Sequence, residues 1–159
     1  MPWEKYLEEH RGVKFDKLTP AREFIMPSYP GLGRIETRIW TRFLETTDME
    51  FLQIRYNVKV GPGDVPEWAI DPTMRRMLYC LTALKIDAVA EDDKHYWIFE
   101  IKPRAGRSAL GQLLSYAYWT VRQFNPKKPI KLGVVCVEVD RNMIEIFEER
   151  GIYIFKVRV

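Results

Sequence analysis

The chain has 159 residues, of which 47% are hydrophobic and 30% are charged, so it is long enough for one domain with a substantial core and too short for two. No apolar run is long enough to span a membrane and the first residues do not resemble a secretory signal, so we expect a cytoplasmic globular protein. The formal charge of +3 is too small to indicate a nucleic-acid partner by itself, because such proteins concentrate positive charge on one surface.

The cysteines and histidines argue against two classes of site. Cys80 and Cys136 lie in apolar runs without the spacing of a metal site, so both are predicted to be reduced and buried. His10 and His95 are the only histidines and have no ligand partners near them, which argues against a histidine metal site and against a His-dependent catalytic triad.

The first third of the chain is predicted to contain one long helix and one strand. Residues 1–33 hold a short amphipathic helix and then a stretch rich in proline and glycine, which we interpret as an extended N-terminal arm with one helical turn. Helical spacing of apolar residues predicts a helix over Arg34–Thr46 whose buried arc contains Leu32, Ile35, Ile39 and Phe43. Glu50–Val60 alternates like a strand with one polar face.

Charged residues on the predicted helix at 34–46 leave two alternatives open. Glu36 falls within the apolar arc, where a carboxylate needs a partner, and a salt bridge is the simplest one. Arg34, Arg38 and Arg42 line a different face at four-residue spacing, where they are either solvated or in contact with phosphates.

The stretch Lys85–Tyr116 contains polar and charged residues in an arrangement that the formation of a hydrophobic core does not require. Ile86–Ala90 and His95–Lys102 are predicted strands joined by a polar turn, which makes a hairpin. Side chains alternate between the two faces of a strand, so the aromatic face of the second strand belongs to the core and contains Trp97, Phe99 and Ile101.

The opposite face of that strand carries Glu100 and Lys102, and the pairing strand contributes Asp87. A hairpin therefore brings two carboxylates and an ammonium group together. Neighbouring carboxylates repel each other, and a hard divalent cation relieves the repulsion. Mg²⁺ prefers oxygen ligands and needs only one or two protein carboxylates. Lys102 then stands where it can orient a water or neutralise charge on a phosphate.

A helix is predicted over Ser108–Phe124, with Ser108 as the N-cap. Gln112 and Tyr116 lie four residues apart on a face next to its apolar stripe, so both can point back toward the tip of the hairpin strand.

The remaining elements complete the predicted fold. Leu132–Val139 is nearly continuous valine and is predicted to be a central strand, followed by a helix at Asn142–Arg150 and a last strand at Ile152–Val159. The order of helices and strands favours a three-layer α/β domain with a mixed sheet, formed by residues 1–159 as one domain.

Asp87, then Glu100-Ile101-Lys102, then Gln112-x-x-x-Tyr116 resembles the PD-(D/E)XK nuclease superfamily, and the last element is similar to that of its RecB-like and phage exonuclease-like branch. The likeness covers about half of the chain and implies a restriction-endonuclease-like fold with an αβββαβ core. One departure is Ile86, which stands where a proline often precedes the first acid.

The resemblance implies roles for particular residues. Asp87, Glu100 and the backbone carbonyl of Ile101 would bind Mg²⁺, for which Mn²⁺ can substitute, and Lys102 would assist the attacking water. The first helix of RecB-like nucleases often carries a glutamate into the metal site, which Glu36 would match. Gln112 and Tyr116 would position substrate and active-site groups. Residues 61–84, with a short helix from Asp71-Pro72 to about Cys80, look like an insertion that shapes the substrate groove.

The function expected from these residues is that of a Mg²⁺-dependent nuclease in a prokaryotic or phage-infected cell, with nucleic acid as the partner and DNA rather than RNA as the expected substrate. Arg104 and Arg107, just past the strand tip, are candidates for clamping phosphates. The alternative of another class is a catalytically inactive nucleic-acid-binding or assembly module that keeps the fold. A purely structural role would not explain why two acids and a lysine lie on one face of the predicted hairpin.

Overall fold

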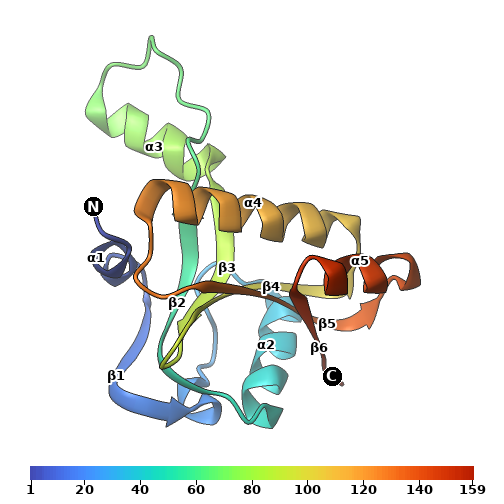
Figure 1. The fold of residues 1–159 in the computed structure, drawn as a ribbon. Coiled ribbons are helices and arrows are strands. Elements are labelled where there is room, and N and C mark those ends of the chain that lie inside the picture. The colour runs from blue at the N-terminus through green and yellow to red at the C-terminus, as the bar shows by residue number, and fades with distance from the viewer.

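Six strands form one mixed sheet in the computed structural model, which describes residues 1–159 (Figure 1). The strands follow one another across the sheet in chain order, and their bounds are β1 Gly12–Pro20, β2 Glu50–Val60, β3 Leu84–Glu91, β4 Tyr96–Ala105, β5 Ile130–Val139 and β6 Ile152–Lys156. Strands β1 to β4 pair antiparallel, whereas β4 with β5 and β5 with β6 pair parallel.

Five α-helices accompany the sheet: α1 Trp3–Glu8, α2 Arg34–Thr46, α3 Pro72–Thr82, α4 Arg107–Phe124 and α5 Ile144–Glu149. Short 3₁₀ helices occupy Ala21–Phe24 and Arg141–Met143. Helix α4 covers one face of the sheet and α2 covers the other (Figure 1). None of the helices has both the length and the apolar content needed to cross a bilayer.

This arrangement confirms the predicted three-layer α/β fold with a mixed sheet. The succession α2-β2-β3-β4-α4-β5 is the αβββαβ core of a restriction-endonuclease-like fold. The parallel pairing of β4 with β5 requires a crossover, and α4 provides it.

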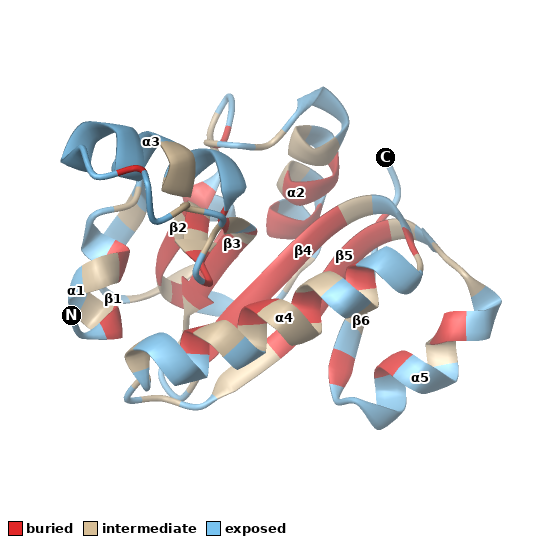
Figure 2. Ribbon diagram, turned by 90° about the horizontal axis from the view of Figure 1, so that it is seen from above, coloured by how far each residue is buried: buried red, intermediate tan, exposed pale blue.

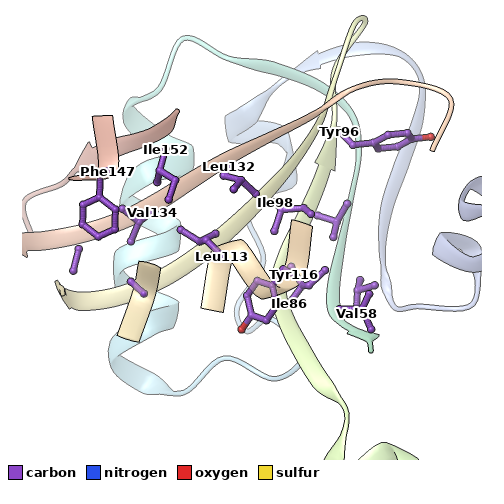
Figure 3. Close-up of a cluster of buried hydrophobic side chains, with 14 of the residues drawn as sticks. Val58, Ile86, Tyr96, Ile98, Leu113, Tyr116, Leu132, Val134, Phe147 and Ile152 are labelled. Atoms are coloured by element: carbon purple, nitrogen blue, oxygen red, sulfur yellow. The ribbon is translucent and has the colours of Figure 1, made fainter. Parts of the chain in front are cut away.

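Two hydrophobic cores lie on opposite faces of the sheet. One packs between the sheet and α4 and includes Ile98, Leu113 and Val134 (Figure 3). The other packs against α2 and includes Trp97 and Phe99. Both faces of β4 are therefore buried along most of its length. The face opposite Trp97 and Phe99 carries Glu100 and also packs into the core against α4.

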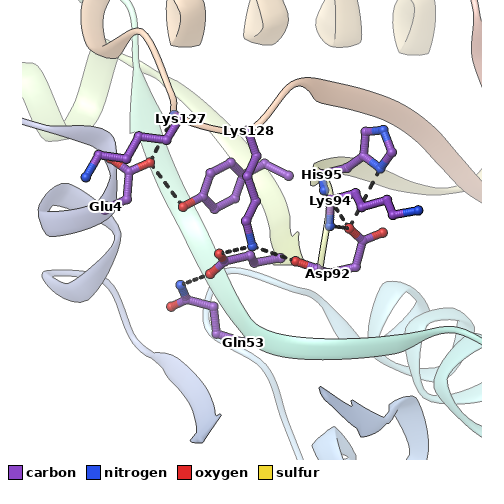
Figure 4. A network of polar contacts seen from close by, with 9 residues as sticks. Glu4, Gln53, Asp92, Lys94, His95, Lys127 and Lys128 are labelled. Carbon is purple, nitrogen blue, oxygen red and sulfur yellow. Dashed lines mark hydrogen bonds and ion pairs between the residues drawn. The ribbon is translucent and has the colours of Figure 1, made fainter. Parts of the chain in front are cut away.

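A polar network holds the turn between β3 and β4 in place (Figure 4). The Asp92 carboxylate accepts hydrogen bonds from the backbone N–H groups of Lys94 and His95 and from the Trp97 indole. Burial alone raises the pKa of Asp92, but these hydrogen bonds outweigh it and lower the pKa below its ordinary value. Lys128 donates to Glu91 at 2.6 Å and so joins the turn to the start of β5. The hairpin that carries the site is thus anchored at its far end.

The structure corrects several expectations about local structure. Residues 12–20, expected to be part of an extended arm, form the edge strand β1, and the helical turn expected after Pro20 is present. Ile35 is exposed, because the buried side of α2 runs through Ile39, Trp40, Phe43 and Leu44. Cys80 is also exposed, whereas Cys136 is buried as expected.

Helix α4 begins one residue earlier than predicted, and Ser108 is not its N-cap. Gly106 takes that position and has no side chain to donate or accept. The helix at Pro72–Thr82 does begin as predicted, since the Asp71 carboxylate accepts a hydrogen bond from the backbone N–H of Met74.

Candidate active site

Most of the predicted site residues line one pocket of about 540 Å³ at the end of β4. One wall comes from the hairpin strands β3 and β4, and the other from the loop before α2 and the first turn of α2. Its lining consists of Gly31, Leu32, Gly33, Glu36, Asp87, Glu100, Ile101, Lys102, Pro103 and Arg104. Six of these ten residues were predicted from the sequence as site residues: Glu36, Asp87, Glu100, Ile101, Lys102 and Arg104.

The pocket lies where strands β3 and β4 separate. The last paired residues of the two strands are Ala88 and Phe99, and beyond them β4 pairs only with β5. The Asp87 carboxylate accepts a hydrogen bond of 2.8 Å from the backbone N–H of Ile101, which has no strand partner on that side. This bond fixes Asp87 beside Glu100 and leaves the strand end open to the pocket.

Asp87 and Glu100 form a close carboxylate pair. Glu100 is only 3% exposed. Burial, then the neighbouring Asp87 charge, raises the pKa of Glu100 to about 8. Burial also raises the pKa of Asp87, although the Ile101 N–H counteracts it. Two carboxyl groups this close hold one proton between them near neutral pH, unless a cation takes its place.

Lys102 and Tyr116 contact the same carboxylate from two sides. The Lys102 Nζ lies 3.8 Å from Glu100 Oε2 and donates to the Ser108 hydroxyl at 3.3 Å. The Tyr116 hydroxyl donates to Glu100 Oε1 at 3.1 Å. Burial, then the negative charge of Glu100, raises the pKa of Tyr116, so its hydroxyl remains a donor at physiological pH. The predicted orientation of Tyr116 toward the strand tip agrees with this geometry.

Gln112 lies one helical turn before Tyr116 on α4, where it counteracts part of the rise in the pKa of Tyr116. Its side-chain oxygen Oε1 is buried and has no hydrogen-bond partner. Gln112 thus lies near Tyr116 and is not part of the pocket lining.

Glu36 faces the pocket from α2 and takes part in none of the salt bridges in the structure. The salt-bridge alternative for Glu36 is therefore not supported. Its carboxylate folds back toward Gly33, where an added Cβ would lie 2.7 Å from Glu36 Oε1. The Glu36 charge contributes to the raised pKa of Asp87, so the two carboxylates interact through the pocket.

The donor atoms at this site suit a hard divalent cation that keeps several waters. No three His, Cys, Asp or Glu side chains in the chain lie close enough together to hold a metal ion, so the structure does not assemble Glu36, Asp87 and Glu100 into one cage. Asp87 and Glu100 alone satisfy the one or two carboxylates that Mg²⁺ requires, and the Ile101 backbone lines the same pocket. The mutual repulsion of the two acids is what such an ion relieves.

The two arginines predicted to clamp phosphates differ in position. Arg104 lines the pocket and forms a surface ion pair of 3.6 Å with Glu138, a weak contact that a phosphate can displace. Arg107 is exposed at the first residue of α4 and does not line the pocket.

Three parts of the site were not identified from the sequence: the loop at Gly31-Leu32-Gly33, Pro103, and Ser108 as the acceptor for Lys102. The loop requires glycine at position 31, because Gly31 has a φ of +81° and a Cβ added there would lie 3.0 Å from the Asn57 side chain. A Gly-x-Gly directly before a helix that carries an acid in its first turn could have indicated this wall.

No model of a known protein family matches the sequence, and no curated protein does either. Among solved structures, the chain is similar to a repair endonuclease from Pyrococcus abyssi, with 16% sequence identity and a TM-score of 0.41. The likeness covers 46% of this chain and 33% of the other, so it spans about a third of that protein's length.

Proposed function

We propose that this chain is a metal-dependent nuclease of the PD-(D/E)XK type that hydrolyses phosphodiester bonds, with DNA as its substrate. The observation that carries the proposal is the Asp87 and Glu100 pair at the open end of β4, with the Lys102 ammonium 3.8 Å from Glu100 in the same pocket. A buried Glu100 beside a half-buried Asp87, both with raised pKa values and contacted by a lysine, a tyrosine and one backbone N–H, is typical of a reactive site.

Asp87, Glu100 and the Ile101 carbonyl are the oxygen donors that would hold Mg²⁺ or Mn²⁺, with Glu36 across the pocket as a candidate second-site ligand. A bound ion supplies charge neutralisation at the scissile phosphate and a lower pKa for a bound water. The other contributions come from side chains of the chain itself.

Tyr116 fixes the direction of the Glu100 carboxylate, because its hydroxyl occupies Oε1 and leaves Oε2 toward Lys102. An ammonium group has three hydrogens to donate, and Ser108 accepts one from Lys102. The others can orient an attacking water and neutralise a phosphate oxygen. Arg104 at the pocket edge is positioned to bind a neighbouring phosphate, and Arg34 and Arg38 are exposed on the first turns of α2.

The test is incubation of the purified chain with plasmid, linear duplex, single-stranded DNA and RNA, each in Mg²⁺, Mn²⁺ or EDTA. We expect metal-dependent cleavage of DNA that EDTA abolishes, and no cleavage by a Glu100→Gln variant. Binding of the same nucleic acids without cleavage in any metal would contradict the proposal and favour a non-catalytic binding module. The pattern of products on plasmid and linear duplex distinguishes endonuclease from exonuclease activity.

A further inference from the structure

Asn57 has a backbone conformation that is unusual inside a strand. Its φ is +54° within β2, and the only other non-glycine residue with a positive φ is Asn125, at the C-cap of α4. This left-handed region is costly for residues that have a Cβ, and asparagine is among the few that enter it. At the end of a helix such a residue is common. Within a strand it is a local strain, of the kind that persists at functional sites.

The pairing of β2 with β3 is interrupted at Asn57. Paired residues flank it on both sides in the same register: Tyr56 with Ala88 and Val58 with Ile86. Asn57 itself stands opposite Asp87, and these two residues do not pair. Asp87 has no partner in β4 either. The residue that carries the first carboxylate of the site is therefore outside the ladders on both sides of β3.

The side chains of both strands change faces at this same position. Residues two apart in a regular strand share a face, but Tyr56 packs in the core against α2 and Val58 in the core against α4. In β3, Ala88 likewise packs against α2 and Ile86 against α4 (Figure 3). A residue outside the extended conformation turns a strand about its axis, as β-bulges do. Beyond this turn, β2 and β3 run past α4 toward α3 (Figure 1).

This change of faces places Asp87 in the pocket. Strand β4 is buried along most of its length (Figure 2), so a carboxylate from β3 reaches the pocket only where β3 leaves it. There the Asp87 carboxylate accepts the backbone N–H of Ile101 in place of a strand partner. Asn57 also contacts the second wall, because a Cβ added to Gly31 would lie 3.0 Å from Asn57 Cβ. Asn57 thus adjoins both walls of the pocket.

We propose that Asn57 is a positioning residue for the candidate metal site. Its left-handed backbone turns β2 and β3 so that Asp87 leaves the sheet and enters the pocket. Asn57 does not line the pocket, so it acts through Asp87 and through the loop at Gly31. Its part in cleavage rests on the proposed nuclease function, whereas its effect on the placement of Asp87 does not.

Amide hydrogen exchange followed by NMR measures the placement of Asp87 without metal or nucleic acid, through the N–H of Ile101. We expect Asn57→Val to reduce the protection of this amide at least about tenfold relative to Val134 in the paired strand β5, because a β-branched residue opposes a positive φ and favours a regular strand. Asn57→Gly should keep the protection, because glycine adopts the same φ freely.

Asn125→Val is the matched control, because it opposes the same backbone conformation at the far end of α4. It should lower the melting temperature without changing the protection of Ile101 relative to Val134. If Asn57→Val does not fold, Asn57→Ala opposes the positive φ less strongly and takes its place in the comparison.

Isothermal titration with Mn²⁺ tests the consequence for the site. Asn57→Val should weaken Mn²⁺ binding about 10- to 100-fold, the range found for residues that orient metal ligands, while Asn57→Gly and Asn125→Val should bind like the parent. The proposal is overturned if the Ile101 amide is as protected in Asn57→Val as in the parent, or if Asn57→Gly loses as much protection as Asn57→Val. A parent that binds no Mn²⁺, with Ile101 responding as expected, would refute the metal-dependent function and still support the placement of Asp87 by Asn57.

Discussion

Lys102 is the residue on which the proposed chemistry depends most. We expect Lys102→Ala to abolish cleavage and to leave binding of Mg²⁺ and DNA largely intact, because Asp87 and Glu100 remain and one cation among several phosphate contacts contributes modestly to affinity. Single-turnover cleavage together with a DNA-binding titration in Ca²⁺ measures both effects. Lys14→Ala on the distant strand β1 is the matched control and should cleave normally.

Two further variants separate the role of the lysine from that of the acids. Lys102→Arg should not restore cleavage, because a planar guanidinium does not reach the same point as the ammonium. Asp87→Asn should instead weaken metal binding, with partial recovery at high Mn²⁺. If Lys102→Ala cleaves like the parent while DNA binding drops sharply, the lysine is a groove contact and the catalytic role belongs elsewhere.

Glu36 lines the pocket and has no ion-pair partner, so neutralising its charge should not lower the stability of the fold. We expect Glu36→Gln to reduce cleavage while leaving the melting temperature in EDTA unchanged or raised, because loss of this charge relieves repulsion with Asp87. Glu45→Gln, on the exposed side of the same helix, should alter neither property. A loss of several kcal/mol in Glu36→Gln would instead indicate a stranded buried partner.

Individual site residues were predictable where a charged side chain interrupts the apolar pattern of a strand. Glu100 and Lys102 interrupt an apolar run at a spacing of two, and Asp87 interrupts the strand before it. The contact of Lys102 with Ser108 was not predictable, because it depends on how the chain turns between the end of β4 and α4. Serine at a helix start suggests a cap, and here Gly106 has that position.

At the scale of elements, periodicity identified α2 and β2 with their observed bounds, since long amphipathic segments carry strong patterns. Strand β1 was missed because its pattern is weak. Its partners lie 30 to 43 residues later in β2, and its register shifts between Lys14 and Thr19. The separation of β3 from β4, which opens the pocket, was likewise invisible in the sequence, because both strands continue beyond their last pair, where β3 stays paired with β2 and β4 with β5.

A prediction about stability compares Gly31, in the loop that forms the second wall of the pocket, with Gly111 in α4. Gly31→Ala should destabilise the fold by about 1 kcal/mol or more, because φ is +81° and the new Cβ would lie 3.0 Å from Asn57. Gly111→Ala should stabilise it by roughly 0.5–1 kcal/mol, because this helical glycine in α4 has open space around it. Chemical denaturation of both variants tests the pair, and equal effects would contradict the loop geometry.

At the scale of the whole molecule, the site is a polar interruption at the end of β4, a strand that is buried on both faces along most of its length. The core against α4 holds Tyr116 next to Leu113 and Ile86, so the same packing that stabilises the domain fixes the hydroxyl that orients Glu100 (Figure 3). Glu100 is buried beside the half-buried Asp87 as a consequence. The free energy of unfolding and the charge state of the site are therefore linked.

That linkage predicts how pH and metal together affect stability. The pKa of Glu100 rises from 4.5 to about 8 on folding, so between these pH values the folded chain retains a proton that the unfolded chain has released. Stability in EDTA should consequently decline as pH rises from about 5 to 8, after which this loss is complete. Glu100→Gln should remove most of this dependence.

In the proposed mechanism a divalent cation takes the place of the shared proton, so Mg²⁺ or Mn²⁺ should raise the melting temperature most at the upper end of this pH range, and EDTA should reverse the gain. Thermal melts of the parent and of Glu100→Gln at pH 5.5 and 8, each with Mn²⁺ and with EDTA, give the four comparisons. The expected result is stabilisation by the ion in the parent at pH 8, little at pH 5.5, and little in the variant at either pH. A gain of equal size at both pH values, or one that persists in Glu100→Gln, would show that the ion binds somewhere other than the carboxylate pair.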